Sequence, residues 1–377
     1  MGDFFFISIG ISGYAIFTTV ILAGWLRARL RHKKSEPGSH HLPASVLIPF
    51  RNEEKRLVPL IFSIKNLIEP FDNVEFIFID DHSDDGSVQL LEQELDEFHQ
   101  VRILKLPMGF SGKKSAISYG ISQTSNETII TTDADCELTS EALLSMVDAL
   151  ANNGTQMVCG PVIQYSGDGF GAKLSDLEFL SLIGSSISFW GVGFPLMANG
   201  AFLGFKQTAF HSVDGFGGNE QFPGGDDVFL LHKIVSFFGS ESIHFITAAK
   251  DVIYTKGDAS WTEFIQRRIR WGAKAKAYRS FSSKMSTMFV LVVNLIYISA
   301  LLYSCVAFEW DLLGMLILLK ILADLLMLTP ILVNFNKWAL IPYIPTASIL
   351  HPFYILFAGA LALWGKYDWK KRNYGDS

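Results

Sequence analysis

The chain has 377 residues, of which 49% are hydrophobic and only 18% are charged, and its formal net charge is −6. This composition is too apolar for a typical soluble enzyme, and the mildly acidic balance argues against a nucleic-acid partner. The three cysteines are scattered, match no metal or disulfide spacing and are consistent with a reducing compartment.

The first apolar run extends from Phe4 to Leu26, and a bilayer core needs about 20 such residues. The strongly basic segment Arg27–Lys34 follows it without a small-residue cleavage pattern, so residues 1–27 are predicted to be an uncleaved transmembrane anchor. By the positive-inside rule, the basic flank stays in the cytoplasm and the amino terminus lies outside.

Three more apolar segments come later in the chain, at Thr287–Phe308, Leu312–Val333 and Thr346–Trp364. They predict a transmembrane region over residues 287–364, followed by a basic tail at 365–377. Three full crossings would place this tail outside, against the charge rule. Alternatively, one segment, such as the proline-rich "LIPYIPTASILHPF", is re-entrant or interfacial and the tail is inside.

Two charged residues interrupt the middle apolar segment. Lys320 and Asp324 are four positions apart and therefore share one face of a helix. Charges within a membrane are costly and often functional. Either the two neutralise each other, or they serve a substrate.

Residues 43–284 alternate between strand and helix patterns. Short apolar runs of the kind found in buried parallel strands occur at Ala44–Phe50, Val74–Ile79, Val101–Leu106 and Glu127–Thr132. Helical periodicity occurs between them, at Glu53–Ile68, Ser87–Phe98 and Lys113–Ser122. This alternation predicts an α/β fold with right-handed crossovers, whose ligands bind at the carboxyl ends of the strands.

Acidic residues gather at two of these strand ends. The segment "DDHSDDGS" follows the second strand, and Asp133 and Asp135 follow the fourth. Residues two apart in an extended strand point the same way, so the last two carboxylates repel each other unless a cation lies between them. No G-x-G-x-x-G follows the first strand, which argues against a dinucleotide. We expect Mg²⁺ or Mn²⁺ that arrives with a diphosphate.

Six motifs in this order resemble the family 2 glycosyltransferases: "VLIPFRNEE", "FIDDHSDDGS", "GFSGKKSAI", "TTDADCEL", "GGDDVFL" and "RRIRW". The resemblance covers about residues 43–280, and the layout is closest to the membrane-bound subset that includes ceramide glucosyltransferase and related lipid glycosyltransferases. It implies a GT-A fold, a Rossmann-like nucleotide-diphospho-sugar transferase domain, between N- and C-terminal transmembrane helices.

The resemblance also implies how the donor is bound. Asp80 and Asp81 match an acidic pair that contacts the uracil or the ribose, which favours a UDP-sugar, and Lys113 matches a lysine near the nucleotide. Asp133 and Asp135 match the D-x-D that holds metal and diphosphate, with Asp135 as the more direct metal ligand.

Neighbouring polar residues have ordinary structural explanations. Asp84 and Ser87 are typical of a helix N-cap and turn, and for Asp84 this competes evenly with a role in binding. Lys114 is expected to be a solvated residue at the start of a helix.

On the acceptor side, the resemblance assigns the catalytic base to Asp227, with Asp226 standing where the family usually has Glu. A carboxylate is needed there to take the proton of the acceptor hydroxyl as its oxygen attacks the anomeric carbon. A single base and a departing nucleotide diphosphate imply one displacement with inversion, and metal charge stabilises the leaving group. Asn199 and Gly200 match the segment that lines the acceptor.

The segment "RRIRW" resembles the Q-x-x-R-W motif, with Arg267 at the Gln position, a form found in the ceramide glucosyltransferase branch. The resemblance places Arg267 and Trp271 against the acceptor and Arg270 near the diphosphate. The alternative is a basic amphipathic helix on anionic lipid, and both functions are compatible.

One further apolar stretch, Leu177–Met197, is long enough to span a membrane. A crossing there would separate Asp135 from Asp227, which must share one site, so we interpret it as interfacial helices that border the acceptor cleft.

The sequence therefore predicts an inverting glycosyltransferase of the inner (plasma) membrane, whose cytoplasmic domain transfers a sugar from a nucleotide sugar to a lipid or lipid-linked acceptor. A processive polysaccharide synthase of the same family is one alternative, and it would yield a ladder of polymers. A non-catalytic membrane scaffold or transporter is another, but its signature, loss of a catalytic carboxylate, is not found in the motifs.

Overall fold

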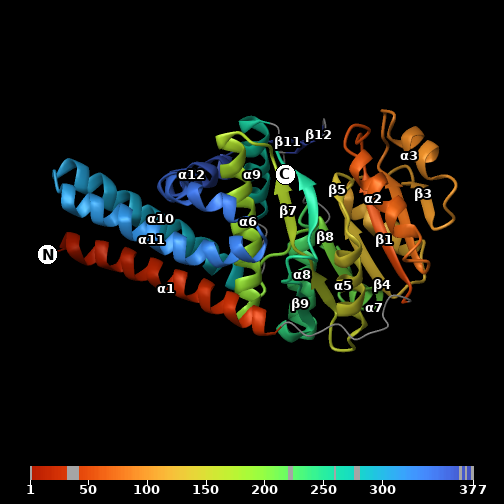
Figure 1. Ribbon diagram of the computed structural model, residues 1–377, viewed down its shortest axis with the longest axis horizontal. Coiled ribbons are helices and arrows are strands. Elements are labelled where there is room, and N and C mark those ends of the chain that lie inside the picture. Colours follow the sequence, from red (N-terminus) through yellow and green to blue (C-terminus); the bar gives the residue numbers. More distant parts are fainter. Residues whose placement is uncertain are drawn as a thin grey trace. The chain divides into compact units, whose positions relative to one another are not determined.

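The computed structural model describes residues 2–31, 42–219, 224–258, 260–275, 281–364, 367–369 and 372–374. The chain divides into two compact units, which Figure 1 shows in ribbon form. The first unit comprises Met1–Arg27, Ser166–Val192 and Gly257–Ser377, and the second comprises Ala28–Tyr165 and Gly193–Lys256.

The second unit is built on a seven-stranded sheet, counted over the described residues, with the strand order β3-β2-β1-β4-β8-β6-β9. Its strands are β1 (Ala44–Phe50), β2 (Val74–Asp80), β3 (Val101–Lys105), β4 (Thr128–Thr132), β6 (Met157–Cys159), β8 (Phe202–Lys206) and β9 (Ile243–Phe245). The first four strands in that order pair in parallel, as predicted, whereas β8 runs antiparallel to both of its neighbours. The carboxyl ends of β1, β2 and β4 therefore lie at one edge of the sheet.

Continuous apolar sequence explains the parallel strands, because β1 and β2 are buried along almost their whole length. The connecting helices are α2 (Val58–Ile68), α3 (Ser87–Leu95), α4 (Lys113–Ser122) and α5 (Ser140–Ala151). Helix α4 has the predicted bounds. The predicted helix at Glu53–Ile68 begins five residues later, because Glu53 O accepts backbone hydrogen bonds from Arg56 and Leu57 in a turn before Pro59.

A smaller three-stranded sheet and two helices complete the second unit among the described residues. The sheet has the order β5-β10-β7, formed by Cys136–Glu137, Ile253–Lys256 and Val162–Tyr165. The helices are α7 (Gln207–Ser212) and α8 (Asp226–Phe238), with a 3₁₀ turn at Ser240–Ser242. Since β5 follows β4 after only three residues, the segment with Asp133 and Asp135 joins the two sheets.

Helices dominate the first unit. They are α1 (Gly2–Leu30), α6 (Phe170–Gly191), α9 (Trp261–Ala275), α10 (Phe281–Val306), α11 (Trp310–Asn334) and α12 (Ile344–Trp364), with a 3₁₀ segment at Trp338–Tyr343 and a short hairpin of β11 (Tyr367–Trp369) and β12 (Arg372–Tyr374). Four described stretches are long and apolar enough to cross a membrane: Gly10–Leu30, Lys284–Val306, Trp310–Asn334 and Trp338–Leu361. They overlap the four predicted spans.

Helix α6 differs from the prediction in its position. The expected interfacial helices at Leu177–Met197 form one helix that begins at Phe170 and ends at Gly191, and Gly193 then takes a φ of +89° that breaks the helix. The helix is not among the four stretches that could span a membrane. It packs on the 3₁₀ segment, α11 and α12 within the first unit. Its role at a membrane surface stays a prediction.

A close backbone contact joins α1 to α6. A Cβ atom placed on Gly24 would lie 2.0 Å from the carbonyl oxygen of Ser188, whereas the same atom on Gly314 would meet nothing within 4 Å. Small residues allow helices to approach in this way, and any side chain at position 24 must push the two helices apart.

We therefore expect Gly24→Ala to lower the free energy of unfolding by about 1–3 kcal/mol, the usual cost of overpacking. Thermal unfolding of the detergent-solubilised protein measures the change. Gly314→Ala is the matched control, and it should be neutral or stabilising by about 0.5–1 kcal/mol because it replaces a glycine inside a helix. Equal melting temperatures for the two variants would show that α1 and α6 are not in contact here.

Candidate active site

Hydrogen bonds fasten the loop after β1 to the acidic loop after β2. The backbone N–H of Asn52 donates to Ser83 Oγ at 3.0 Å, and the N–H of Asp84 donates to Asn52 Oδ1 at 2.9 Å. The N–H of Glu53 donates to Ser87 Oγ at 2.8 Å. These hydrogen bonds hold the loops after β1 and β2 against each other at one edge of the sheet. Asn52 takes a left-handed backbone conformation there, with a φ of 53°.

The start of α3 corrects one predicted role. Asp84 lies in the turn, but the carboxylate at the helix start belongs to Asp85, which accepts hydrogen bonds from the backbone N–H and the hydroxyl of Ser87. Burial alone would raise the pKa of Asp85, but the two bonds from Ser87 outweigh it and lower this pKa. The carboxylate of Asp85 therefore stabilises the backbone at the start of α3.

Asp80 and Asp81 are both 4% exposed and face different partners. Asp80 Oδ1 accepts the N–H of Ser83 at 2.8 Å, which closes its own loop. Asp81 Oδ2 accepts the N–H of Gly112 at 2.9 Å, and Gly112 precedes the first residue of α4. Asp81 thus positions Lys113, while the predicted contact of this acidic pair with a nucleotide stays a prediction.

Lys113 lies at the centre of a half-buried charge cluster. Its Nζ is 2.7 Å from Asp133 Oδ1 and 2.9 Å from Asp226 Oδ2, and it donates to the carbonyl of Gly200 at 3.1 Å. Burial disfavours the charged amine, but the attraction of Asp133 and then Asp226 outweighs this cost and raises the pKa of Lys113. Lys113 is therefore a permanent cation that links β4, α8 and the segment before β8.

Asp227 lies beside this cluster in the first turn of α8. Its Oδ2 accepts the N–H of Gly200 at 3.1 Å, and its Oδ1 accepts the N–H of Val228 at 2.7 Å. A Cβ atom at Gly200 would lie 2.7 Å from Asp226 Oδ2 and 3.1 Å from Lys113 Nζ, so a larger residue there must displace this ion pair. The adjacent Asn199 accepts the N–H of Ala201 at 3.0 Å through its side-chain oxygen. The structure thus brings predicted donor and acceptor residues together in the second unit.

Asp135 has a cationic neighbour that the motifs did not indicate. Arg56 Nη1 lies 4.0 Å from Asp135 Oδ2. A second arginine, Arg51, donates from Nη1 to the carbonyl of Asp81 at 2.9 Å. Both follow β1, so basic residues just after the first strand were the available sequence signal for cations at this edge.

Lys114 is not the solvated residue that we expected. It is only 8% exposed, its Nζ donates to the carbonyl of Asn219 at 2.6 Å, and the amine lies 4.9 Å from the centre of the Phe229 ring. The expectation was wrong because a helix start next to a second packed segment is not open to solvent.

The R-R-I-R-W motif lies on α9 in the first unit. Arg267 pairs with Asp258 at 2.5 Å and stacks over the rings of Phe179 and Trp271, at 5.5 and 5.4 Å from their centres. The predicted contact of Arg267 with an acceptor therefore competes with its ion pair to Asp258. The side chain of Arg270 lies outside the described residues.

Arg268, which the motif comparison passed over, is the most buried arginine of this segment among the described side chains. It is 5% exposed, pairs with Glu178 of α6, and its guanidinium carbon lies 4.3 Å from the centre of the Trp271 ring. Burial lowers the pKa of Arg268 to about 10, a loss that Tyr354 partly offsets, so the residue stays charged at neutral pH. Arg268 thus fixes α9 on α6 and holds Trp271.

The residues present fit a metal that shares its ligands with a diphosphate. Among the described residues, no cluster of three or more His, Cys, Asp or Glu side chains could hold a metal alone. Two carboxylates, Asp133 and Asp135, stand at the strand end, and Mg²⁺ is usually bound by one or two carboxylates together with phosphate and water.

Comparison with known proteins identifies the domain. Residues 45–213 match the family model "Glycosyl transferase family 2". A beta-monoglucosyldiacylglycerol synthase of Trichormus variabilis is 30% identical over 141 residues, which cover 37% of this chain and 30% of that protein. A 4,4'-diaponeurosporenoate glycosyltransferase of Staphylococcus haemolyticus is 32% identical over 137 residues, 36% of this chain and 34% of that protein. The matched stretch thus spans about a third of each curated relative.

The fold is also found in a solved structure. A mannosyltransferase from Pyrobaculum calidifontis in complex with GDP-Man and Mn²⁺ aligns with a TM-score of 0.60 and 18% identity, over 95% of this chain and 99% of that one. This match confirms the predicted GT-A fold. The motifs at 224–230 and 267–271 lie outside the matched family segment. Over residues 45–213 the predicted resemblance is confirmed, and this part of the chain is a family 2 glycosyltransferase domain.

Proposed function

We propose that this protein is an inverting, membrane-inserted glycosyltransferase that transfers a sugar from a nucleotide-diphosphate sugar to a lipid or lipid-linked acceptor. The observation that carries the proposal is the cluster around Lys113, which draws Asp133 and Asp226 together from distant parts of the chain. It brings together the D-x-D segment of the family 2 domain and the G-G-D-D segment, whose Asp133 and Asp226 are 93 positions apart in the chain.

On the donor side, we propose that Asp80, Asp81, Lys113 and Arg270 contact the nucleotide diphosphate, with a UDP-sugar favoured. The fixed edge formed by the loops after β1 and β2 supports this, because ligands of α/β sheets bind where parallel strands end. The mannosyltransferase from Pyrobaculum calidifontis, solved with GDP-Man and Mn²⁺, supports a nucleotide sugar as the donor class.

Asp133 and Asp135 are proposed to hold Mg²⁺ or Mn²⁺, with Asp135 the more direct ligand. The cation would supply positive charge that stabilises the departing nucleotide diphosphate. Lys113 Nζ, 2.7 Å from Asp133 Oδ1, neutralises part of the negative charge of Asp133 and so reduces the repulsion that this segment would exert on a diphosphate.

Asp227 is proposed as the catalytic base. The acceptor hydroxyl oxygen forms a bond to the anomeric carbon, the bond from that carbon to the diphosphate oxygen breaks, and the hydroxyl proton passes to Asp227. One displacement inverts the anomeric configuration. The N–H of Gly200 fixes Asp227 Oδ2, and Asp226 pairs with Lys113. The two neighbouring carboxylates thus have separate tasks: Asp226 positions the site and Asp227 takes the proton.

The acceptor side is proposed to include Asn199, Gly200, Asp226, Arg267 and Trp271. A lipid acceptor is supported by four helical stretches that are long and apolar enough to cross a membrane, and by two relatives whose names, a monoglucosyldiacylglycerol synthase and a diaponeurosporenoate glycosyltransferase, refer to lipids. The basic segment Arg27–Lys34 supports a catalytic domain on the cytoplasmic side of the inner membrane.

Asp227→Asn should lower the rate of sugar transfer about 10²–10⁴-fold, the usual contribution of a general base, while donor binding persists. Purified membranes are screened with radiolabelled UDP- and GDP-sugars, and label is counted in the organic-extractable product. Asp96→Asn, which removes an exposed carboxylate at the end of α3, is the charge-matched control and should keep the parent rate. Transfer by Asp227→Asn at the parent rate would refute the mechanism, and a ladder of water-soluble polymers would favour a processive synthase.

Asp135→Asn should weaken binding of Mn²⁺ in the presence of a nucleoside diphosphate by at least about tenfold, because second-shell changes alone cost 10–100-fold at metal sites. Electron paramagnetic resonance of free Mn²⁺ reports this without any need for transfer. Chelation of divalent ions should also stop transfer, and added Mg²⁺ or Mn²⁺ should restore it. Unchanged Mn²⁺ binding by Asp135→Asn would remove Asp135 from the metal site.

Lys113→Met should destabilise the protein by about 1–3 kcal/mol, because two carboxylates then lose their shared hydrogen-bonded cation. The double variant Lys113→Met with Asp226→Asn should recover part of this loss, since one of the unpaired charges is gone. Thermal unfolding of the four members of this cycle measures the coupling. Additive effects of the two changes would mean that the ion pair contributes nothing to folding.

A further inference from the structure

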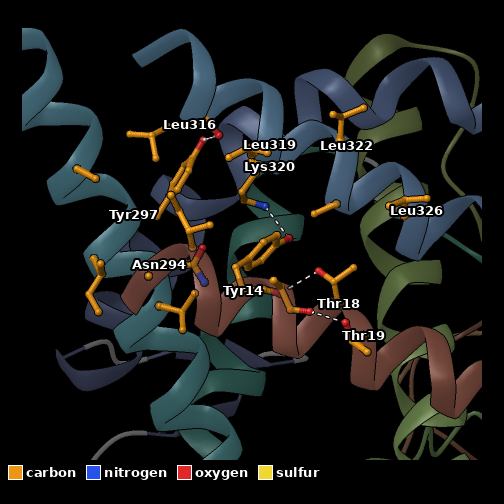
Figure 2. Close-up of a pocket in the computed structure, with 17 residues that line it drawn as sticks. Tyr14, Thr18, Thr19, Asn294, Tyr297, Leu316, Leu319, Lys320, Leu322 and Leu326 are labelled. Atoms are coloured by element: carbon orange, nitrogen blue, oxygen red, sulfur yellow. Dashed lines mark hydrogen bonds between the residues drawn. The ribbon is translucent and has the colours of Figure 1, made fainter. Parts of the chain in front are cut away.

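A cavity of about 320 Å³ lies among α1, α10 and α11 in the first unit (Figure 2). All three helices contain stretches that are long and apolar enough to cross a membrane. Its size is at the lower end of the range for small-molecule sites. None of its lining residues is among those assigned above to the donor, the metal or the acceptor.

The cavity lining includes Tyr14 and Lys320, which belong to a three-residue cluster with Asp324. Lys320 Nζ lies 2.8 Å from Asp324 Oδ2 and donates to the hydroxyl of Tyr14 at 2.9 Å, while the Tyr14 hydroxyl donates to Asp324 Oδ1. Lys320 and Asp324 are 4% and 5% exposed. The predicted internal pair is therefore real, and Tyr14 of α1 completes it. The trio carries no net charge.

Buried polar and apolar residues share the inner part of the cavity, and exposed leucines lie at its opening. Thr18, Asn294 and Lys320 line it and are buried, at 8%, 5% and 4% exposed. Leu322 and Leu326 also line it and are 47% and 63% exposed, so they form the open side. This arrangement suits a ligand with one polar function at the inner end of a hydrocarbon chain.

The ammonium of Lys320 can accommodate one more acceptor. An ammonium has three N–H donors, and within the described part of the chain Lys320 Nζ has two hydrogen-bond partners, Tyr14 and Asp324. Lys320 is the eleventh residue of α11, about 15 Å along the helix axis from Trp310. That is about half the 30 Å thickness of the hydrocarbon core, where a ligand charge is costly. The polar function should therefore be uncharged.

We propose that this cavity binds an uncharged membrane lipid. The hydroxyl oxygen of the lipid accepts the third N–H of Lys320, and its hydrocarbon chain packs against the leucines of the rim. An anionic phosphate fits less well, since Asp324 already neutralises Lys320. The site rests on the membrane insertion proposed above but not on sugar transfer.

Photolabelling in nanodiscs tests the site. The protein is reconstituted with a diazirine-bearing diacylglycerol or with a phosphatidic acid that carries the same chains, irradiated and digested, and adducts are mapped by mass spectrometry. Adducts on the cavity segments of α1, α10 and α11 should form about tenfold more with diacylglycerol, a difference of one hydrogen bond to a charged group. Equal labelling of the cavity by the two lipids would show that bilayer lipid enters it without selection for an uncharged headgroup, and adducts only elsewhere would show that no lipid binds there. Either result would overturn the proposal.

Cavity-filling variants make the test specific. Ala323→Phe and, at the exposed rim, Ala15→Phe both add bulk to lining positions and should reduce cavity adducts about tenfold, whereas Ala358→Phe on α12, outside the lining, should leave them unchanged. Two filling variants are used so that one that fails to fold can be set aside by its melting temperature. Undiminished adducts in a folded filling variant would refute the site. Asp227→Asn should label as the parent does, which separates this result from the fate of the proposed transfer.

Discussion

A half-buried ammonium holds the candidate site together. Lys113 pairs with Asp133 after β4 and with Asp226 at the start of α8, and it also binds the carbonyl of Gly200. Two carboxylates that converge in a poorly solvated site are stable only with a cation between them, because like charges there repel strongly. Lys113 is that cation in the folded chain, and Asp227 stands where it does because Gly200 is fixed between them.

The same requirement separates the roles of the acidic residues. Asp80 and Asp85 accept hydrogen bonds from backbone N–H groups of their own loop. Asp81 accepts one from the N–H of Gly112, just before α4. Asp133 and Asp135 stand between cationic groups, at 2.7 Å from Lys113 and 4.0 Å from Arg56 respectively. The acidic loop after β2 therefore mainly stabilises the local structure of the site. The D-x-D segment is where we propose that a metal ion and the phosphates of the donor bind.

Sequence patterns located the strand ends well, because period and burial are local properties: four parallel strands were found to within one residue, and α4 has the predicted bounds. Contacts between side chains that are far apart in the chain are not local properties, so the sequence could not assign them. Lys114 looked solvated but is covered by the segment at Asn219, and Arg268 was passed over although Glu178, 90 positions earlier, buries it. The predicted start of α2 was five residues too early, because the residues before Pro59 form a hydrogen-bonded turn despite their helical periodicity.

Buried charges in the first unit follow the rule that governs Lys113. The i,i+4 spacing of Lys320 and Asp324 made their pairing readable from sequence, yet their third partner, Tyr14, is 306 positions from Lys320 and became visible only in the fold. In hydrocarbon such a trio is retained at a cost, since a well-packed apolar replacement is often as stable as a buried ion pair. A neutral, hydrogen-bonding cluster that opens on a cavity with leucines at its rim therefore fits the proposed binding of an uncharged lipid better than that of a charged one.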